Sequence, residues 1–174
     1  MQNTELELLI VADGEDVRDL IPDVENIRLI HLEDQLSIGT KRNFGCERAL
    51  GKIIAHWDDD DYSAPDRLAD QLGRLHSSGK MVTGYHSMRF KEDDIWWQYP
   101  GTIAFAIGTS LCYYREFWRQ NQFPHIQIGE DNAFQAKAWE LGQIENADAR
   151  EMMYATIHAG NTSPRNLKTY RRIE

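Results

Sequence analysis

Short apolar runs alternate with helix-like segments in the first half of the chain. The runs 6–12, 27–32 and 53–57 are rich in leucine, isoleucine and valine, and polar residues follow each of them, which indicates strands. The segment 37–50 carries apolar residues at helical spacing and ends before Gly51. Strands that alternate with helices over short connections predict a parallel sheet covered by helices, the α/β class.

The second half predicts shorter strands, which add antiparallel or mixed pairs to that sheet. Its apolar runs are separated by polar turns and by Pro100-Gly101. The whole chain is therefore expected to form one mixed, mostly parallel sheet flanked by helices. We expect strands at 81–90, 95–99, 103–107 and 152–157, and helices at 66–75 and 130–141.

The composition fits a single globular domain. The 174 residues are 41% hydrophobic and 27% charged, and no apolar stretch is long enough to cross a membrane. The start of the chain lacks the pattern of a signal peptide, so we expect a cytoplasmic location. A net charge of −9 argues against nucleic acid as a partner, because gripping a phosphate backbone requires clustered lysine and arginine.

Four consecutive acids, Asp58 to Asp61, directly follow the apolar run 53–57. The ends of strands in an open α/β sheet are the usual place for a ligand. Adjacent carboxylates repel one another, and a divalent cation relieves that repulsion. Because side chains alternate along a strand end, Asp58 and Asp60 should share one side, where oxygen ligands suit Mg²⁺ or Mn²⁺. A solvated acidic turn that caps the next helix through Asp61 or Ser63 explains the same residues.

Five polar segments of the chain follow expected strands or begin an expected helix. The segments are Asp13-Gly14-x-Asp16, Gly39-x-Lys41-Arg42-Asn43-x-Gly45, Asp58-x-Asp60-Asp61 with Pro65, Gly129-Glu130-Asp131, and His158-Ala159-Gly160-Asn161-Thr162-Ser163. In order and spacing they resemble family 2 glycosyltransferases with the GT-A fold, and together they cover nearly the whole chain. The resemblance implies a Rossmann-like GT-A domain with a nucleotide-sugar half at about 1–78, an acceptor and catalytic half at about 79–160, and a tail at 161–174.

The resemblance assigns the acidic turn to the metal and the sugar donor. It implies that Asp58, Asp60 and His158 hold Mn²⁺ or Mg²⁺, and that Asp58 and Asp59 also contact the donor. A histidine near a strand end is equally often structural, although neutral imidazole is a good ligand for Mn²⁺.

The nucleotide is expected near the ends of the first two strands. The resemblance implies that Asp13 accepts a hydrogen bond from the base or ribose, and that Lys41 and Arg42 lie near the phosphates. A carboxylate at a strand end suits such polar edges. A simple turn aspartate and exposed helical charges are the structural alternatives.

Asp131 is the residue on which the reaction type depends. Inverting glycosyl transfer needs a base that removes the proton of the acceptor hydroxyl, and the resemblance places Asp131 in that role, with Glu130 as a further catalytic or acceptor-orienting group. An acid in the first turn of a helix also stabilises that helix without any catalytic duty.

The acceptor is expected against flat and hydroxylated side chains. Trp96 and Trp97 offer faces on which sugars can pack, and Thr109 and Ser110 offer hydroxyl donors. Aromatic residues at such positions are more often in the core, but two adjacent residues on a strand point in opposite directions, so at least one tryptophan should face away from it.

The sequence therefore predicts a metal-dependent inverting glycosyltransferase that moves a sugar from a nucleoside diphosphate donor, expected to be UDP, to a carbohydrate or other hydroxyl acceptor. The family pattern normally opens with another strand and helix before 6–12, so we expect an open sheet edge through which a homo-oligomer could form. The alternatives are an inactive binding or assembly module with the same fold, and a metal-dependent nucleotidyltransferase, for which the chain lacks a glycine-rich triphosphate loop.

Overall fold

The fold comes from a computed structural model, which describes residues 6–14, 16–162 and 166–173. Short 3₁₀ turns lie at Arg18–Leu20, Gly108–Ser110 and Leu167–Thr169. The strands are β1 (Leu8–Asp13), β2 (Ile27–Leu32), β3 (Ile53–Ala55), β4 (Tyr62–Ser63), β5 (Val82–Glu92), β6 (Ile95–Tyr99), β7 (Cys112–Tyr114), β8 (Ile144–Asp148), β9 (Met153–Thr156) and β10 (Arg171–Arg172), and the α-helices are α1 (Ile38–Arg48), α2 (Arg67–Ser78), α3 (Arg115–Gln120) and α4 (Glu130–Glu140).

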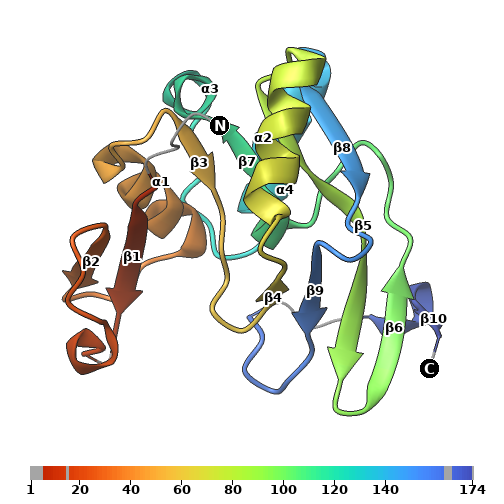
Figure 1. The fold of residues 1–174 in the computed structure, drawn as a ribbon, viewed down its shortest axis with the longest axis horizontal. Helices are drawn as coiled ribbons and strands as arrows, with labels where there is room; N and C mark the ends of the chain where they lie inside the picture. The colour runs from red at the N-terminus through yellow and green to blue at the C-terminus, as the bar shows by residue number, and fades with distance from the viewer. Residues whose placement is uncertain (1–5, 15, 163–165, 174) are drawn as a thin grey trace.

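The long strand β5 organises the main sheet (Figure 1). Its first half pairs with β7 and β8, and its second half pairs with β6 and β9. Beyond these neighbours, β3 pairs with β7, β4 with β9, and β10 with β6. The β1–β2, β5–β8 and β5–β9 pairs are parallel and the others are antiparallel. The predicted α/β class with a mixed sheet is confirmed, but among the described strands more pairs are antiparallel than parallel, because β3 pairs with β7 and not with β1 or β2.

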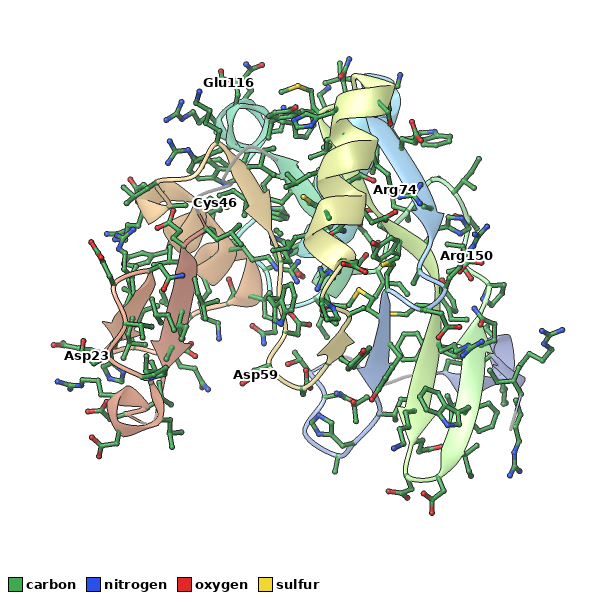
Figure 2. The ribbon with its side chains drawn as sticks, in the orientation of Figure 1. Asp23, Cys46, Asp59, Arg74, Glu116 and Arg150 are labelled. Atoms are coloured by element: carbon green, nitrogen blue, oxygen red, sulfur yellow. The ribbon has the colours of Figure 1, made fainter. Side chains whose placement is uncertain are left out.

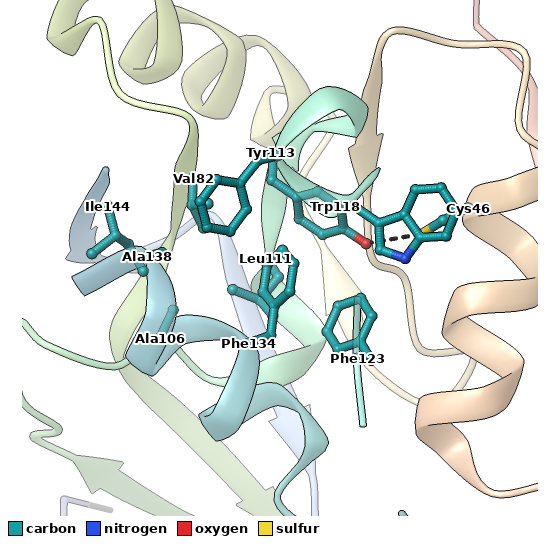
Figure 3. Packing of buried hydrophobic residues seen from close by; sticks show 11 residues of the cluster. Cys46, Val82, Ala106, Leu111, Tyr113, Trp118, Phe123, Phe134, Ala138 and Ile144 are labelled. Carbon is teal, nitrogen blue, oxygen red and sulfur yellow. Dashed lines mark hydrogen bonds between the residues drawn. The ribbon is translucent and has the colours of Figure 1, made fainter. Parts of the chain in front are cut away.

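Two apolar cores lie along β5. The first joins α4 to β5 and β7, and its rings are tightly packed, with Phe123 stacked on Phe134 at a centroid distance of 4.3 Å. Figure 3 shows this core with the hydrogen bond between the Cys46 sulfur and the Tyr113 hydroxyl, 3.1 Å long. The second core covers one face of the part of the main sheet formed by β6, β9 and the second half of β5, and it contains Phe90. Both cysteines are buried free thiols, and burial raises the pKa of Cys46 to about 11.

The strands β1 and β2 form a separate two-stranded sheet. The carboxylate of Glu7, just before β1, accepts hydrogen bonds from the backbone N–H groups of Leu50 and Gly51, just before β3, at 2.5 and 2.8 Å. The strands β1 and β3 therefore start at the same end, and Figure 1 shows β1 and β3 running in the same direction. Within the described part of the chain, β1 and β3 each pair along one edge only.

Most expected elements are found within a few residues of their predicted bounds, but the strand at 103–107 is wrong. The chain there forms a turn with one isolated bridge between Thr102 and Phe105. Gly101 has a φ of +56°, and a Cβ atom on it would collide with the His86 carbonyl, so this segment folds close against β5 instead of extending. None of the described helices has the length and apolar character needed to span a membrane.

Candidate functional site

The acidic turn between β3 and β4 gathers three carboxylates. Ligand oxygens of Asp58, Asp60 and Asp61 all lie within 4.8 Å of one another. Asp58 and Asp60 are exposed, whereas Asp61 is half-buried. Asp59 is exposed and its side chain points away from β4 (Figure 2). The turn therefore presents a compact set of oxygen donors to solvent.

A buried arginine, Arg67, anchors both ends of this turn. Its Nη2 donates to the carbonyls of His56 and Thr109 at 2.7 and 2.8 Å, and its Nη1 donates to the Ser63 hydroxyl at 2.8 Å. The guanidinium lies over the Trp57 ring at 4.6 Å. One cation therefore ties the chain before the acids to the chain after them, and sequence patterns gave no sign of this role.

Asp61 links the turn to the end of β9. Its carboxylate accepts the backbone N–H of Thr156 at 3.0 Å. Burial is the main cause that raises the pKa of Asp61 to about 6; the charges of Asp58 and Asp60 add to it, and the Thr156 hydrogen bond opposes it. Neither Asp61 nor Ser63 caps α2: Asp66 occupies the N-cap and makes no side-chain capping bond.

His158 joins the acidic turn through Asp60. Its Nε2 lies 2.8 Å from the Asp60 carboxylate, and the Asn161 amide donates to the same oxygen at 3.3 Å. The Gly160 N–H points at His158 Nδ1 at 3.1 Å, so Nδ1 accepts and Nε2 carries the proton that bonds Asp60. His158 lies outside the set formed by Asp58, Asp60 and Asp61, and it contacts that set from one side.

The donors of the turn fit a hard divalent cation. Although Asp58 is partly open to solvent, the protein around its carboxyl group desolvates it and raises its pKa; the charge of Asp60 adds to this shift and the charge of Arg42 opposes it. A bound cation would relieve this cost of ionising Asp58. The Thr109 hydroxyl is buried close to Asp58 and Asp61, yet within the described part of the chain it makes no hydrogen bond of good geometry. Carboxylate and hydroxyl oxygens are the ligands that Mg²⁺ and Mn²⁺ prefer.

Asp131 lies against the same segment from the side of α4. A Cβ atom built on Gly108 would fall 2.5 Å from Asp131 Oδ2, so this carboxylate packs on the Gly108 backbone, next to Thr109. The other oxygen, Oδ1, accepts the Asn132 N–H at 2.8 Å. The candidate base and the acidic turn thus lie beside neighbouring residues of one buried 3₁₀ turn.

Arg42 and Glu130 pair with each other across α1 and α4. Their side chains form a 2.6 Å ion pair and are 16% and 6% exposed. Burial raises the pKa of Glu130, and the charge of Arg42 opposes that shift. The pair fixes the first turn of α4, which carries Asp131, relative to the helix that follows β2.

Asp13 and Lys41 form a second ion pair at the end of β1. Lys41 Nζ lies 2.8 Å from Asp13 Oδ1, and the Leu36 N–H donates to Oδ2 at 2.9 Å. Burial acts to raise the pKa of Asp13, but these two hydrogen bonds outweigh it and hold the pKa below its usual value. Both residues therefore lie at the strand end where the nucleotide was predicted.

The four acceptor candidates are not placed alike. Ser110 is fully buried, and its hydroxyl bonds to the Tyr85 backbone and the Ile107 carbonyl. Trp97 packs against the second core and donates to Glu92 at 3.2 Å. Thr109 is buried beneath the acids. Trp96 points to the opposite face from Trp97, so one tryptophan faces away from the core, as the sequence predicts.

Replacing Gly108 with alanine should lower any activity that depends on Asp131 without unfolding the protein. The new Cβ would push Asp131 Oδ2 away, and a misplacement of about 1 Å can cost on the order of 10²-fold in rate. Gly73→Ala on α2 is the matched control, because a Cβ there meets nothing within 4 Å. Equal rates for the two variants, measured alongside their thermal unfolding, would contradict this.

Comparison with known proteins identifies the family of the chain. The sequence pattern described as Glycosyl transferase family 2 matches residues 2–136. The chain belongs to glycosyltransferase family 2. No curated protein matches the sequence.

Solved structures of S. aureus TarS share the fold. TarS 1–349 in complex with UDP-GlcNAc superposes with a TM-score of 0.70 at 19% identity over 90% of this chain. TarS 1–349 in complex with UDP gives 0.68 at 21% identity, also over 90% of this chain. This chain spans about half of those two, 51% and 53%. At such identity the likeness establishes the GT-A-like fold alone.

Proposed function

We propose that this family 2 domain is a metal-dependent inverting glycosyltransferase that moves a sugar from a UDP-linked donor to an acceptor hydroxyl. The observation that carries the proposal is the pairing of two acidic groups around one buried turn. Asp58 and Asp61 lie near the Thr109 hydroxyl, and Asp131 packs on the adjacent Gly108. A displacement at one carbon requires a site for the leaving group and a base close to it, and these two sets of carboxylates would provide them.

In this proposal Asp58, Asp60 and Asp61 would hold Mn²⁺ or Mg²⁺, with His158 at the edge of the site. The ion, when bound, neutralises charge on the departing diphosphate. Asp13 and Lys41, at the end of β1, would contact the nucleoside diphosphate, and Asp59 would face the donor. The nucleotide-sugar half would then end near residue 78, and the acceptor half would follow it up to about residue 160.

Asp131 would act as the base. Its carboxylate takes the proton of the acceptor hydroxyl while that oxygen forms a bond to the anomeric carbon. The bond from that carbon to the diphosphate oxygen breaks with its electron pair, so UDP leaves from the opposite face and the configuration inverts. The proton on Asp131 then returns to solvent. The Arg42–Glu130 pair would act on this step by fixing the position of α4.

UDP titrations with and without Mn²⁺ test the donor site. We expect binding that requires the metal and that weakens by roughly tenfold or more in Asp60→Asn, because even outer groups of metal sites change affinity by about 10–100-fold. Asp66→Asn is the matched control, since Asp66 is exposed at the start of α2 and makes no capping bond. Binding that is equally strong without metal, or in Asp60→Asn, would refute the metal-dependent donor site.

We also propose that the second edges of β1 and β3 support a homo-oligomer. Within the described residues these edges make no strand pair, and their apolar residues are only half-buried. Such edges accept a strand from another chain. Light scattering over a range of protein concentrations should detect a dimer, and a monomeric mass throughout would rule out this assembly.

A further inference from the structure

The part of the main sheet formed by β4, β9, β5 and β6 has one face that the two apolar cores do not cover. Strand register places Tyr62 of β4 beside Tyr154 of β9, Tyr154 beside Arg89 of β5, and Arg89 beside Gln98 of β6. Side chains at laterally paired positions share a face, and so do residues two apart, which adds Trp96. The opposite face carries the second core. We call this the open face.

Three aromatic rings form a row on the open face. The Tyr62 and Tyr154 rings are stacked at 4.8 Å with an angle of 15° between their planes. The Trp96 ring meets Tyr154 edge-on at 5.0 Å and 78°. Tyr62 is 45% exposed, and Tyr154 and Trp96 are partly exposed. Lys91 Nζ lies 5.8 Å from the Trp96 ring. The row offers flat apolar surfaces with a cation at one side.

A polar hollow adjoins this row. It has a volume of about 290 Å³ and is lined by Arg89, Gln98, Asp148, Arg150 and Glu151. Arg89 and Glu151 approach to 3.6 Å across it, and Figure 2 shows Arg150 in the turn between β8 and β9. Since Arg89 is the register neighbour of Tyr154, the hollow continues the aromatic row. Planar donors and acceptors of both charges line it, which suits a neutral ligand with many hydroxyls.

The open face is also continuous with the acidic turn. Tyr62 directly follows Asp61, and Thr156, two residues beyond Tyr154, donates its N–H to Asp61. From β4 to β6 the face crosses four strands, about 14 Å at the usual strand spacing. A ligand lying along it would be longer than one sugar and would have one end near the carboxylates.

We propose that the open face binds an oligosaccharide, which stacks on Tyr62, Tyr154 and Trp96 and forms hydrogen bonds in the hollow. Sugar rings combine apolar C–H faces with hydroxyl groups, and this surface provides a partner for each. That the open face is the acceptor site rests on the proposed glycosyl transfer. That the open face binds a carbohydrate does not depend on that proposal. Trp96 keeps the acceptor role expected from the sequence, and Tyr62 and Tyr154 take the places of Trp97 and Ser110.

Titration with cellohexaose, maltohexaose and chitohexaose tests the open face, with Trp96→Ala and Tyr62→Ala as variants. At least one hexaose should bind the unaltered chain, and each variant should raise its Kd by about threefold to tenfold, the size of a ring-stacking contact. Trp139→Ala is the control, because Trp139 is 48% exposed on α4, and Tyr62→Phe should retain binding. Circular dichroism confirms that each variant is folded.

UDP titration of the same proteins separates the two proposals. UDP binding that is unchanged in Trp96→Ala and Tyr62→Ala, together with weaker hexaose binding, supports the open face as a separate sugar site. If UDP binds and none of the three hexaoses does, or if Trp139→Ala weakens hexaose binding as much as Trp96→Ala, the open face is refuted and the donor site stands. If a hexaose binds and UDP does not, the open face stands and the transferase fails.

Discussion

Replacing Asp131 with asparagine should lower the rate of sugar transfer by roughly 10²–10⁴-fold, the usual contribution of a general base. Asparagine keeps the shape that packs on Gly108 but cannot take a proton. The fold and UDP binding should therefore be retained, since among the described residues the Asp131 side chain accepts a hydrogen bond from the neighbouring Asn132 N–H, which the asparagine carbonyl can also accept. Transfer from a UDP-sugar to a hexaose, measured as UDP release, is the readout.

Glu140→Gln is the matched control for this experiment. Glu140 ends the same helix, is exposed, and forms a surface pair with Lys137 at 2.9 Å, so its neutralisation should leave the rate unchanged. A rate within threefold of the unaltered chain for Asp131→Asn would exclude Asp131 as the base. The reaction would then need another group beside the acidic turn.

Replacing Arg67 with methionine should lower the free energy of unfolding by about 2–6 kcal/mol, because each of two buried carbonyls left without a donor costs about 1–3 kcal/mol. The side chain is fully buried, and its loss leaves the carbonyls of His56 and Thr109 without their donor. Methionine fills much of the volume but donates nothing. Because these carbonyls flank the acidic turn, metal-dependent UDP binding should also weaken.

Arg74→Met on the same helix provides the comparison. Arg74 is 34% exposed and pairs with Asp70 one turn away at 2.8 Å, so its loss should cost about 1 kcal/mol or less. Urea unfolding of both variants measures the difference. If Arg67→Met is no less stable than Arg74→Met, the buried arginine does not support the turn.

The candidate site was partly predictable from local sequence. Asp58 and Asp60 follow an apolar strand, and Asp131 begins a helix, so residue type and position pointed to both. The ion pair of Arg42 with Glu130 was not predictable, because the two residues are far apart in the chain and their helices meet only in the fold. The burial of Ser110 and of Arg67 was not predictable for a different reason, because hydroxyl and arginine side chains are usually exposed.

Local sequence was enough to predict the α/β class, the strands at 6–12 and 27–32, and the acids at a strand end, because periodicity and turn residues are local signals. The remaining features depend on contacts between distant segments. The tertiary structure placed Asp131 against Gly108, set Tyr62 beside Tyr154, and separated β1 and β2 from the main sheet. These outcomes depend on strand pairing and on packing between distant segments, which no single stretch of sequence specifies.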